Sequence, residues 1–192
     1  MHLIIIEDWD EALRMVKSVM GWWHGYYAKA SRAIGARGLV LKVDGNSIGS
    51  TIYYSIKLPS LSIGVVYYVV VRREYRGRGY GKILVSSAEE LMEPVDLIVA
   101  TINGDNRSSI SMFNSLSYKL YKWDELYEIN GSLSDAIYRV TCSYEDDIVA
   151  IKTSLDISEV KFNQSDMEES MKVWDTACYR PWRRLKNRRL FV

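Results

Sequence analysis

The stretch REYRGRGYGK, from Arg73 to Lys82, combines three glycines with four basic side chains. Gly77, Gly79 and Gly81 alternate with larger residues, and a backbone without Cβ atoms can approach a ligand closely. The stretch follows an apolar, strand-like run and precedes a helix-like run. Backbone N–H groups at such a helix start converge on one point and favour an anion there. The segment therefore predicts an anion-binding loop, with a diphosphate as the expected target.

Other readings of this loop differ in how well they match the sequence. A glycine-rich turn between a strand and a helix often serves only the turn itself. A Walker loop requires glycine at position 76 and Ser or Thr at position 83, where this chain has arginine and isoleucine. The GxGxxG dinucleotide fingerprint fails at Lys82, and the loop lies well inside the chain, after an antiparallel meander. Coenzyme A remains as the diphosphate ligand.

The elements that position the loop follow from periodicity and turn chemistry. We expect strands at Leu3–Glu7, on both sides of the Asp44-Gly45 turn, at Ser62–Val71, at Val95–Thr101 and at Tyr118–Ile129. We expect helices after Asp8, in part of Gly21–Gly35, from the loop to Pro94, and from about Asn106 to Leu116.

The loop lies inside a strand–loop–helix–strand unit. Such a crossover makes Ser62–Val71 and Val95–Thr101 parallel neighbours with a right-handed connection. The strands before them are joined by tight turns and are therefore antiparallel. The predicted fold class is α/β (α+β): a mixed, mostly antiparallel sheet with a central parallel pair and helices on both faces.

Three motifs together resemble the GCN5-related N-acetyltransferase (GNAT) superfamily. Arg76–Gly81 resembles the family's Arg/Gln-x-x-Gly-x-Gly/Ala signature, and VDGNSIGSTIYY resembles its second and third strands. NRSSISMFNSLSY, from Asn106 to Tyr118, resembles its later motif. The resemblance covers roughly residues 3 to 142. It implies a GNAT-like acyl-CoA-binding domain at 1–142 and a C-terminal extension at 143–192.

The resemblance also implies roles for individual residues. The N–H groups of Gly77 to Gly81 would hold the pyrophosphate, the strand end Val69–Val71 would pair with the pantetheine arm, and Asn106 would hydrogen-bond it. The Val69 N–H would face the thioester carbonyl as an oxyanion donor. The expected cofactor-binding residues are Val69, Val70, Val71, Arg76, Gly77, Arg78, Gly79, Tyr80, Gly81, Lys82 and Asn106. The co-substrate would be acetyl-CoA, with no metal, and the acceptor an amine on a small molecule or a protein.

Two positions depart from the family pattern. Phe113 stands where many members place a tyrosine acid, and Val65 stands where many place a glutamate base. Glu7 at the end of the first strand, and Tyr67 on the face expected to hold Val65 and Val69, are the catalytic candidates. Their alternatives are structural, a packing tyrosine for Tyr67 and a helix cap for Glu7 and Asp8.

The missing acid and base leave two functions open on the same fold. One is an N-acyltransferase that moves acetyl to a primary amine, and the other is a coenzyme A sensor without catalysis. The aromatic stretch GWWHGYY, from Gly21 to Tyr27, marks one wall of the acceptor site by the same resemblance. We expect Trp23 to pack on the sheet and His24 to be packed or exposed, and leave both roles open for Trp22, Tyr26 and Tyr27.

Composition narrows the setting. The chain has 192 residues, 48% of them hydrophobic and 26% charged, which is ordinary for a globular protein. A net charge of +1 argues against nucleic acid as a partner, and no apolar run reaches the length of a membrane span. Cys142 and Cys178 lie in no CxxC or Cys/His spacing, so we expect no zinc site, and we expect a reducing, cytoplasmic location.

The segment after residue 142 carries a strand, an amphipathic helix and a basic tail. Ser165 and Glu168 predict a capped helix start, with a stripe of Met167, Met171, Trp174 and Cys178, and Pro181 should end or kink the helix. The apolar stripe could cover the acceptor side of the domain or a second subunit in a homodimer, or could simply be a surface helix on the sheet.

Overall fold

The computed structural model describes residues 2–92 and 94–189. The strands are β1 (Leu3–Glu7), β2 (Arg37–Val43), β3 (Asn46–Lys57), β4 (Ser62–Val71), β5 (Leu97–Ile102), β6 (Lys119–Lys122) and β7 (Ile148–Thr153). The helices are α1 (Trp9–Met20), α2 (Trp22–Ser31), α3 (Tyr80–Leu91), α4 (Arg107–Ser115), α5 (Trp123–Thr141), α6 (Gln164–Trp174) and α7 (Arg180–Arg189), with a π-helical segment, η3 (Asp175–Tyr179), between α6 and α7.

Within the described residues the seven strands form one sheet in the order β1-β2-β3-β4-β5-β7-β6. β4 and β5 pair in parallel, and the remaining neighbours pair antiparallel. Asp44 and Gly45, with φ of 46° and 81°, close the β2–β3 hairpin as their sequence predicts. The fold class expected from the sequence is confirmed.

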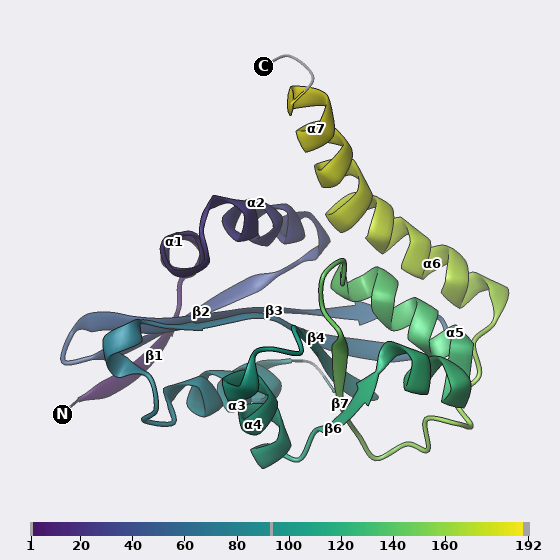
Figure 1. Ribbon diagram of the computed structural model, residues 1–192, viewed down its shortest axis with the longest axis horizontal. Helices are drawn as coiled ribbons and strands as arrows, with labels where there is room; N and C mark the ends of the chain where they lie inside the picture. The colour runs from purple at the N-terminus through teal and green to yellow at the C-terminus, as the bar shows by residue number, and fades with distance from the viewer. Residues whose placement is uncertain (1, 93, 190–192) are drawn as a thin grey trace.

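Helices cover both faces of this sheet (Figure 1). One core packs α1, α2 and α5 against the sheet around Val40, Ile52 and Leu133. The other packs α3 and α4 against the opposite face around Leu84 and Phe113. Asp8 caps α1, accepting a hydrogen bond of 2.9 Å from the Glu11 N–H, as its spacing predicts. Two such cores fix the central strands from both sides.

The prediction of one long strand at Tyr118–Ile129 is wrong. Only Lys119–Lys122 is a strand, and α5 begins directly after it. The backbone N–H of Lys122 donates to the Glu125 side chain at 2.9 Å, so the acidic first turn caps the helix. Leu126 of α5 is fully buried. This tertiary packing outweighs the β propensity of the flanking aromatic residues, on which the strand prediction depended.

The sheet continues past residue 142, where a domain boundary was expected. β7 lies between β5 and β6 and pairs with both. The first part of the C-terminal segment is therefore built into the sheet. Among the described strands β6 pairs with β7 alone, so the end of the region that resembles the family depends on the later strand.

The C-terminal helix begins two residues before the expected cap. Asn163 is the N-cap, and Asp166 rather than Glu168 completes the reciprocal capping hydrogen bonds. Asp166 also accepts from the Ser60 N–H at 2.8 Å, which anchors this helix to the β3–β4 turn. In the expected apolar stripe Met171 is 47% exposed while Cys178 is fully buried.

Pro181 does not end this helix. The chain passes through the π-helical segment η3 into α7, and Pro181 falls in the first turn of α7. The Arg180 N–H donates to Asp175 O across the π-helical turn, so the regular i to i−4 hydrogen-bond pattern is already interrupted directly before the proline, and the helix continues through it. The last part of the expected basic tail, residues 190–192, lies outside the described residues.

The sequence led us to expect a reducing location, but Cys142 and Cys178 form a disulfide with a Cα–Cα distance of 5.4 Å. The bond ties the end of α5 to η3. The spacing of 36 residues carried no signal for the pairing, because the fold alone brings the two positions together.

Candidate functional site

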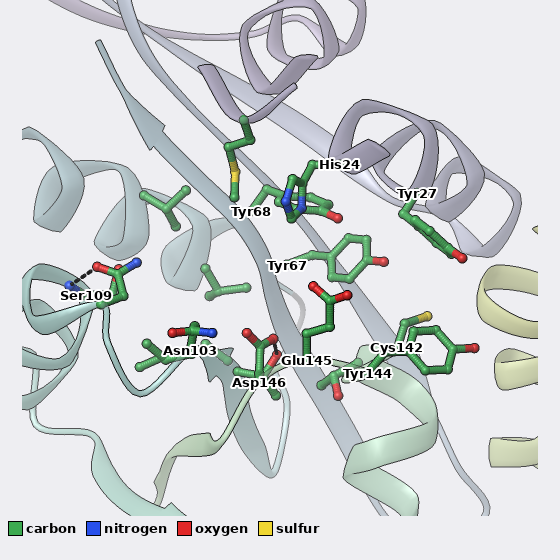
Figure 2. Close-up of a pocket in the computed structure, with 18 of the residues that line it drawn as sticks. His24, Tyr27, Tyr67, Tyr68, Asn103, Ser109, Cys142, Tyr144, Glu145 and Asp146 are labelled. Carbon is green, nitrogen blue, oxygen red and sulfur yellow. Dashed lines mark hydrogen bonds between the residues drawn. The ribbon is translucent and has the colours of Figure 1, made fainter. Parts of the chain in front are cut away.

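A cavity opens where the two parallel strands separate. β4 and β5 pair only at Ile63–Val65 and Leu97–Val99, although both strands continue beyond these residues. A cavity of about 540 Å³ occupies the region beyond this pairing, and its walls include Val66–Val69 of β4 and Ala100–Ile102 of β5. Figure 2 shows the side chains that surround it. Splayed strands of this kind leave backbone groups available to a ligand.

A β-bulge reshapes this end of β4. Ile52 of β3 pairs with Tyr68 and the next residue pairs with Val66, so Tyr67 is the extra residue. Val65 and Tyr67 belong to the core under α1 and α5, whereas Val69 belongs to the core under α3. The expectation that Val65, Tyr67 and Val69 share one face is therefore wrong for Val69, because the bulge interrupts the period of two.

The Val69 backbone is directed into the gap. The Arg72 N–H donates to Ile48 O of β3 at 2.9 Å, and the pairing of Ser50 with Val70 continues that alternation. In an antiparallel pair the residues between bonded pairs turn their N–H and C=O groups away from the partner strand. Val69 and Val71 are those residues, so their backbone groups face the β5 side, beyond the end of the β4–β5 pairing at Val65.

The glycine loop follows β4 directly and leads into α3. Gly77 and Gly79 have φ of 76° and 81°, a region that other residues enter only with strain, and a Cβ atom at either would meet nothing within 4 Å. Gly79 is the N-cap of α3 and makes no side-chain capping bond. Gly81 has a different task, because a Cβ there would lie 2.8 Å from Met112 Sδ of α4. Two glycines thus shape the turn and one permits helix packing.

Among the basic side chains of the loop, one holds the loop against the end of β4 and the others are exposed to solvent. Arg76 donates from Nε to Val71 O at 2.9 Å, which ties the loop back to the end of β4. The Arg78 guanidinium lies 5.9 Å from the centre of the Tyr75 ring. Lys82 is exposed on α3. Open glycines, a helix start without a side-chain cap and nearby cations form a donor set that suits a diphosphate.

The α4 side of the cavity holds the other residues singled out by sequence. Asn106 is the N-cap of α4, and its Oδ1 accepts from the Ser109 N–H at 3.1 Å. Phe113 is 4% exposed, lines the cavity and meets Tyr118 edge-on, with ring centres 4.9 Å apart. Val65 is buried in the parallel pairing. The side chains of Phe113 and Val65 carry no group that can exchange a proton.

Glu7 lies away from the cavity. Its carboxylate forms two hydrogen bonds with the Arg37 guanidinium, at 3.0 and 2.5 Å. These bonds hold the pKa of Glu7 below its ordinary value. Glu7 is absent from the described cavity lining, so the structure does not bring it together with Val69 and Tyr67.

Two carboxylates that sequence reasoning missed do line the cavity. Glu145 and Asp146 come from the loop between α5 and β7. Thr101 of β5 donates from Oγ1 to Asp146 at 2.7 Å. Burial, above all, raises the pKa of Asp146, and the neighbouring carboxylates of Asp147 and Glu145 add to that rise. The acidic run at 145–147 was a weak signal, since its nearness to β5 depends on the position of β7.

Aromatic rings form the opposite wall. Trp23, His24 and Tyr27 of α2 line the cavity with Tyr67 and Tyr68 of the bulge. Burial raises the pKa of Tyr27 to about 12 and that of Tyr67 well above its ordinary value. Both hydroxyls therefore stay protonated at neutral pH and can donate hydrogen bonds, but they cannot serve as bases.

The remaining aromatic residues of the GWWHGYY stretch lie outside the described cavity lining. Trp22 is 54% exposed, and Tyr26 donates its hydroxyl to Pro181 O at 3.1 Å. The latter bond places the C-terminal helix against α2. Trp182 of α7 and Cys142 of the disulfide also line the cavity, so this helix borders the site, as one of the readings of the sequence expected.

The part of the chain that the structure describes holds neither a metal cluster nor a membrane helix. Within residues 2–92 and 94–189, no group of three or more His, Cys, Asp and Glu side chains is arranged to hold a metal ion. None of the helices in these ranges has the length and apolar content that a membrane crossing requires.

Solved structures share this fold. Naa50 of Arabidopsis thaliana, solved in complex with the bisubstrate analogue CoA-Ac-MVNAL, matches at a TM-score of 0.53 and 14% identity, covering 80% of this chain and 99% of that chain. The PaiA N-acetyltransferase of Thermoplasma acidophilum, in complex with coenzyme A, matches at 0.52 and 13%, covering 80% and 99%. A GCN5-related glucosamine N-acetyltransferase region of a fungal multi-domain β-N-acetylglucosaminidase matches at 0.53 and 16%, covering 62% of this chain and only 17% of that chain.

Fold similarity at such low identity shows the fold alone, so the assignment to a family comes from sequence comparison. No curated protein matches the chain. The model of the Acetyltransferase (GNAT) family matches residues 5–118, more than half of the chain, and this region includes β4, the glycine loop, α3, β5 and α4. The chain therefore belongs to the Acetyltransferase (GNAT) family.

Proposed function

We propose that this protein is an acyl-CoA-dependent N-acyltransferase that moves acetyl from acetyl-CoA to a primary amine by direct attack. The observation that carries the proposal is the cavity between β4 and β5, which Val69 and Asn106 line together with the carboxylates of Glu145 and Asp146. The glycine loop itself is outside the described lining and follows β4 along the chain. A group-transfer site needs both features, because one end must hold the donor while the other receives the acceptor.

The donor end is formed by backbone more than by side chains. The N–H groups of Gly77 to Gly81 hold the diphosphate, with Arg78 and Lys82 adding positive charge. Val69–Val71 pair with the pantetheine arm through the backbone groups that face the gap. Asn106 contributes a side-chain amide at the start of α4. Acetyl-CoA, when bound, supplies an activated thioester.

The transfer requires bond formation at the amine nitrogen, stabilisation of the carbonyl oxygen and departure of the thiolate. The amine nitrogen forms the new C–N bond, the C–S bond breaks, and its electron pair leaves on sulfur. The Val69 N–H stabilises the negative charge that develops on the carbonyl oxygen, a contribution of about 3 kcal/mol for one donor. The thiolate needs little help to leave, because a free thiol has a pKa of about 8.5.

Proton removal from the amine falls to Asp146 in this proposal. Its carboxylate lines the cavity, is fixed by Thr101 and has a raised pKa, which brings its basicity closer to neutral pH. The Tyr67 hydroxyl stays protonated, so in this proposal it is available to donate a hydrogen bond to the reactants. Glu7 is engaged by Arg37 and takes no part.

A coenzyme A sensor is the second candidate. The buried, apolar Phe113 and Val65 favour it, because both family positions for proton transfer are closed to that chemistry. We propose an amine acceptor, on a small molecule or a protein, as the partner, and a homodimer as a second proposal on assembly. A cytoplasmic location is also a proposal, and the Cys142–Cys178 disulfide is a bond that reducing compartments disfavour.

The variant Val69→Pro tests the proposal. Proline removes the N–H that faces the gap without removing a hydrogen bond to β3. We expect amine-dependent release of thiol from acetyl-CoA to fall about 10²- to 10³-fold in kcat. Stabilisation by coenzyme A, measured as a thermal shift, should persist and report that the variant is folded. A variant that binds coenzyme A and keeps the wild-type kcat would contradict the oxyanion role.

A further inference from the structure

The two sulfurs of the Cys142–Cys178 disulfide have different surroundings. Cys142 is partly exposed and lines the cavity between β4 and β5, and Figure 2 shows its side chain among the lining residues. Cys178 is fully buried and is absent from the described cavity lining. The rate of thiol–disulfide exchange depends on which sulfur an attacking thiolate can reach. A thiol that enters the cavity therefore meets the sulfur of Cys142 first.

The same cavity receives the thiol end of coenzyme A in the proposed function. Val69 lines the cavity together with Cys142, and Val69–Val71 are the proposed contacts of the pantetheine arm. Each acetyl transfer leaves the coenzyme there as a free thiol. With a pKa of about 8.5, a few per cent of such a thiol is thiolate at neutral pH, the form that attacks a disulfide. A free thiol from solvent has the same chemistry.

The disulfide joins two segments of the cavity wall. Cys142 ends α5 and directly precedes the loop that carries Glu145 and Asp146, both of which line the cavity. Cys178 lies in η3, four residues before Trp182, which also lines the cavity. Opening the bond therefore releases this loop from the C-terminal helix and changes the wall of the site.

The surroundings of Cys178 suit the thiol that exchange would produce. Its Sγ lies 3.6 Å from Arg139 O of α5, so the new thiol would find a hydrogen-bond acceptor without moving. The hydrogen bond from the Tyr26 hydroxyl to Pro181 O still holds the helix against α2. Exchange at Cys142 is therefore compatible with a folded C-terminal segment.

We propose that Cys142 is a thiol-exchange site for a small aliphatic thiol that enters the cavity. The thiolate attacks Cys142 Sγ, a new S–S bond forms there, and the bond to Cys178 breaks. The electron pair leaves on Cys178 Sγ, which takes up the proton that the entering thiol released. The entering thiol is thus oxidised to a mixed disulfide, and Cys178 is reduced. Coenzyme A as the source rests on the proposed coenzyme A binding, but not on acetyl transfer, whereas glutathione would come from solvent.

The test uses two variants that both lack the bond and differ in the thiol that they keep. Cys178→Ala keeps Cys142, and Cys142→Ala keeps the buried Cys178. Each is incubated without reductant with the disulfide of coenzyme A or of glutathione, and intact-protein mass spectrometry follows the adduct. We expect Cys178→Ala to react at least about tenfold faster, because its thiol lines the cavity. Equal rates, or no adduct on either variant, would overturn the site.

Wild type tests the site with the bond in place and does not depend on how well the variants fold. The protein is exposed to reduced coenzyme A, quenched in acid and digested, so that peptide masses assign the adduct. We expect the adduct on Cys142 and a free thiol at Cys178. An adduct on Cys178 instead, or no adduct at a coenzyme A concentration that gives the full thermal shift, would contradict the proposal.

The two disulfide reagents separate the sources of the thiol. In Cys178→Ala, a rate with the coenzyme A disulfide at least about tenfold above that with the glutathione disulfide supports coenzyme A, and the added change Gly79→Val in the glycine loop should remove that excess. Similar rates support a free thiol from solvent. Exchange at Cys142 without any acetylated amine would count against acetyl transfer alone, whereas acetyl transfer without exchange would count against the thiol site alone.

Discussion

Gly79→Val is the most informative single change in the glycine loop. Gly79 has φ of 81° and stands at the N-cap of α3, where a Cβ atom would point into open space. The substitution therefore meets no neighbouring atom in the unliganded protein. It would, however, place a branched side chain where we propose that the backbone of the loop contacts the diphosphate. Its effect on binding should exceed its effect on folding.

The chain supplies a matched control. Gly35 has φ of 88°, and a Cβ atom added there would also meet nothing within 4 Å, but it follows α2 and the short 3-10 turn at Arg32–Ile34, away from the glycine loop. A non-glycine residue in this left-handed region costs on the order of 1–3 kcal/mol. Gly35→Val and Gly79→Val should therefore lower the melting temperature by similar amounts in the absence of ligand.

Acetyl-CoA separates the two variants. At a ligand concentration 100 times the dissociation constant, binding adds about 2.7 kcal/mol to the stability. For a protein of this length that corresponds to a rise of roughly 5–11 °C in Tm. Differential scanning fluorimetry should show this rise for wild type and Gly35→Val, and none for Gly79→Val. A full rise in Gly79→Val, or its equal loss in Gly35→Val, would refute the assignment of the loop to the diphosphate.

Four further predictions concern other parts of the chain. Asp146→Asn should lower kcat by about 10²-fold and remove the fall in kcat/KM that wild type shows as pH drops through the raised pKa of Asp146; a surviving acidic limb would contradict this. Because a raised folded pKa favours the protein at low pH and that gain is lost as pH rises through it, the same variant should be more stable than wild type at neutral pH by urea titration. Phe113→Tyr should keep coenzyme A binding and not reduce turnover, and lost binding in calorimetry would show that α4 is misplaced. Replacing Cys142 and Cys178 together by alanine should lower the free energy of unfolding by about 4 kcal/mol, as the chain-entropy estimate gives for a separation of 36 residues, whereas an unchanged value would argue that the disulfide does not form.

Local patterns predicted the helix start and the turns that surround the glycine loop, while its contacts with coenzyme A stay predictions. Gly77 and Gly79, where the sequence predicted an open glycine loop, have positive φ, and Asp8 caps α1 as expected. Both features depend on a few adjacent residues. The order of the first strands and the parallel crossover likewise follow from turn chemistry and chain connectivity.

The acceptor end could not be predicted in the same way. The bulge at Tyr67 shifts Val69 to the other face, and period-two reasoning has no signal for an extra residue. Asp146 reaches the cavity only because β7 inserts between β5 and β6, a long-range choice that local sequence does not encode. Cys142 meets Cys178 for the same kind of reason.

Acetyl transfer itself is tested most directly by mass spectrometry of the products. Acetyl-CoA carrying an isotope label in the acetyl group is incubated with the protein and a panel of amines, and both the small molecules and the protein are searched for labelled acetyl. We expect label on an amine nitrogen in proportion to the coenzyme A released, and a large loss of label in Val69→Pro. Tight binding of coenzyme A with no labelled amine from any member of the panel would contradict the enzyme and support the sensor.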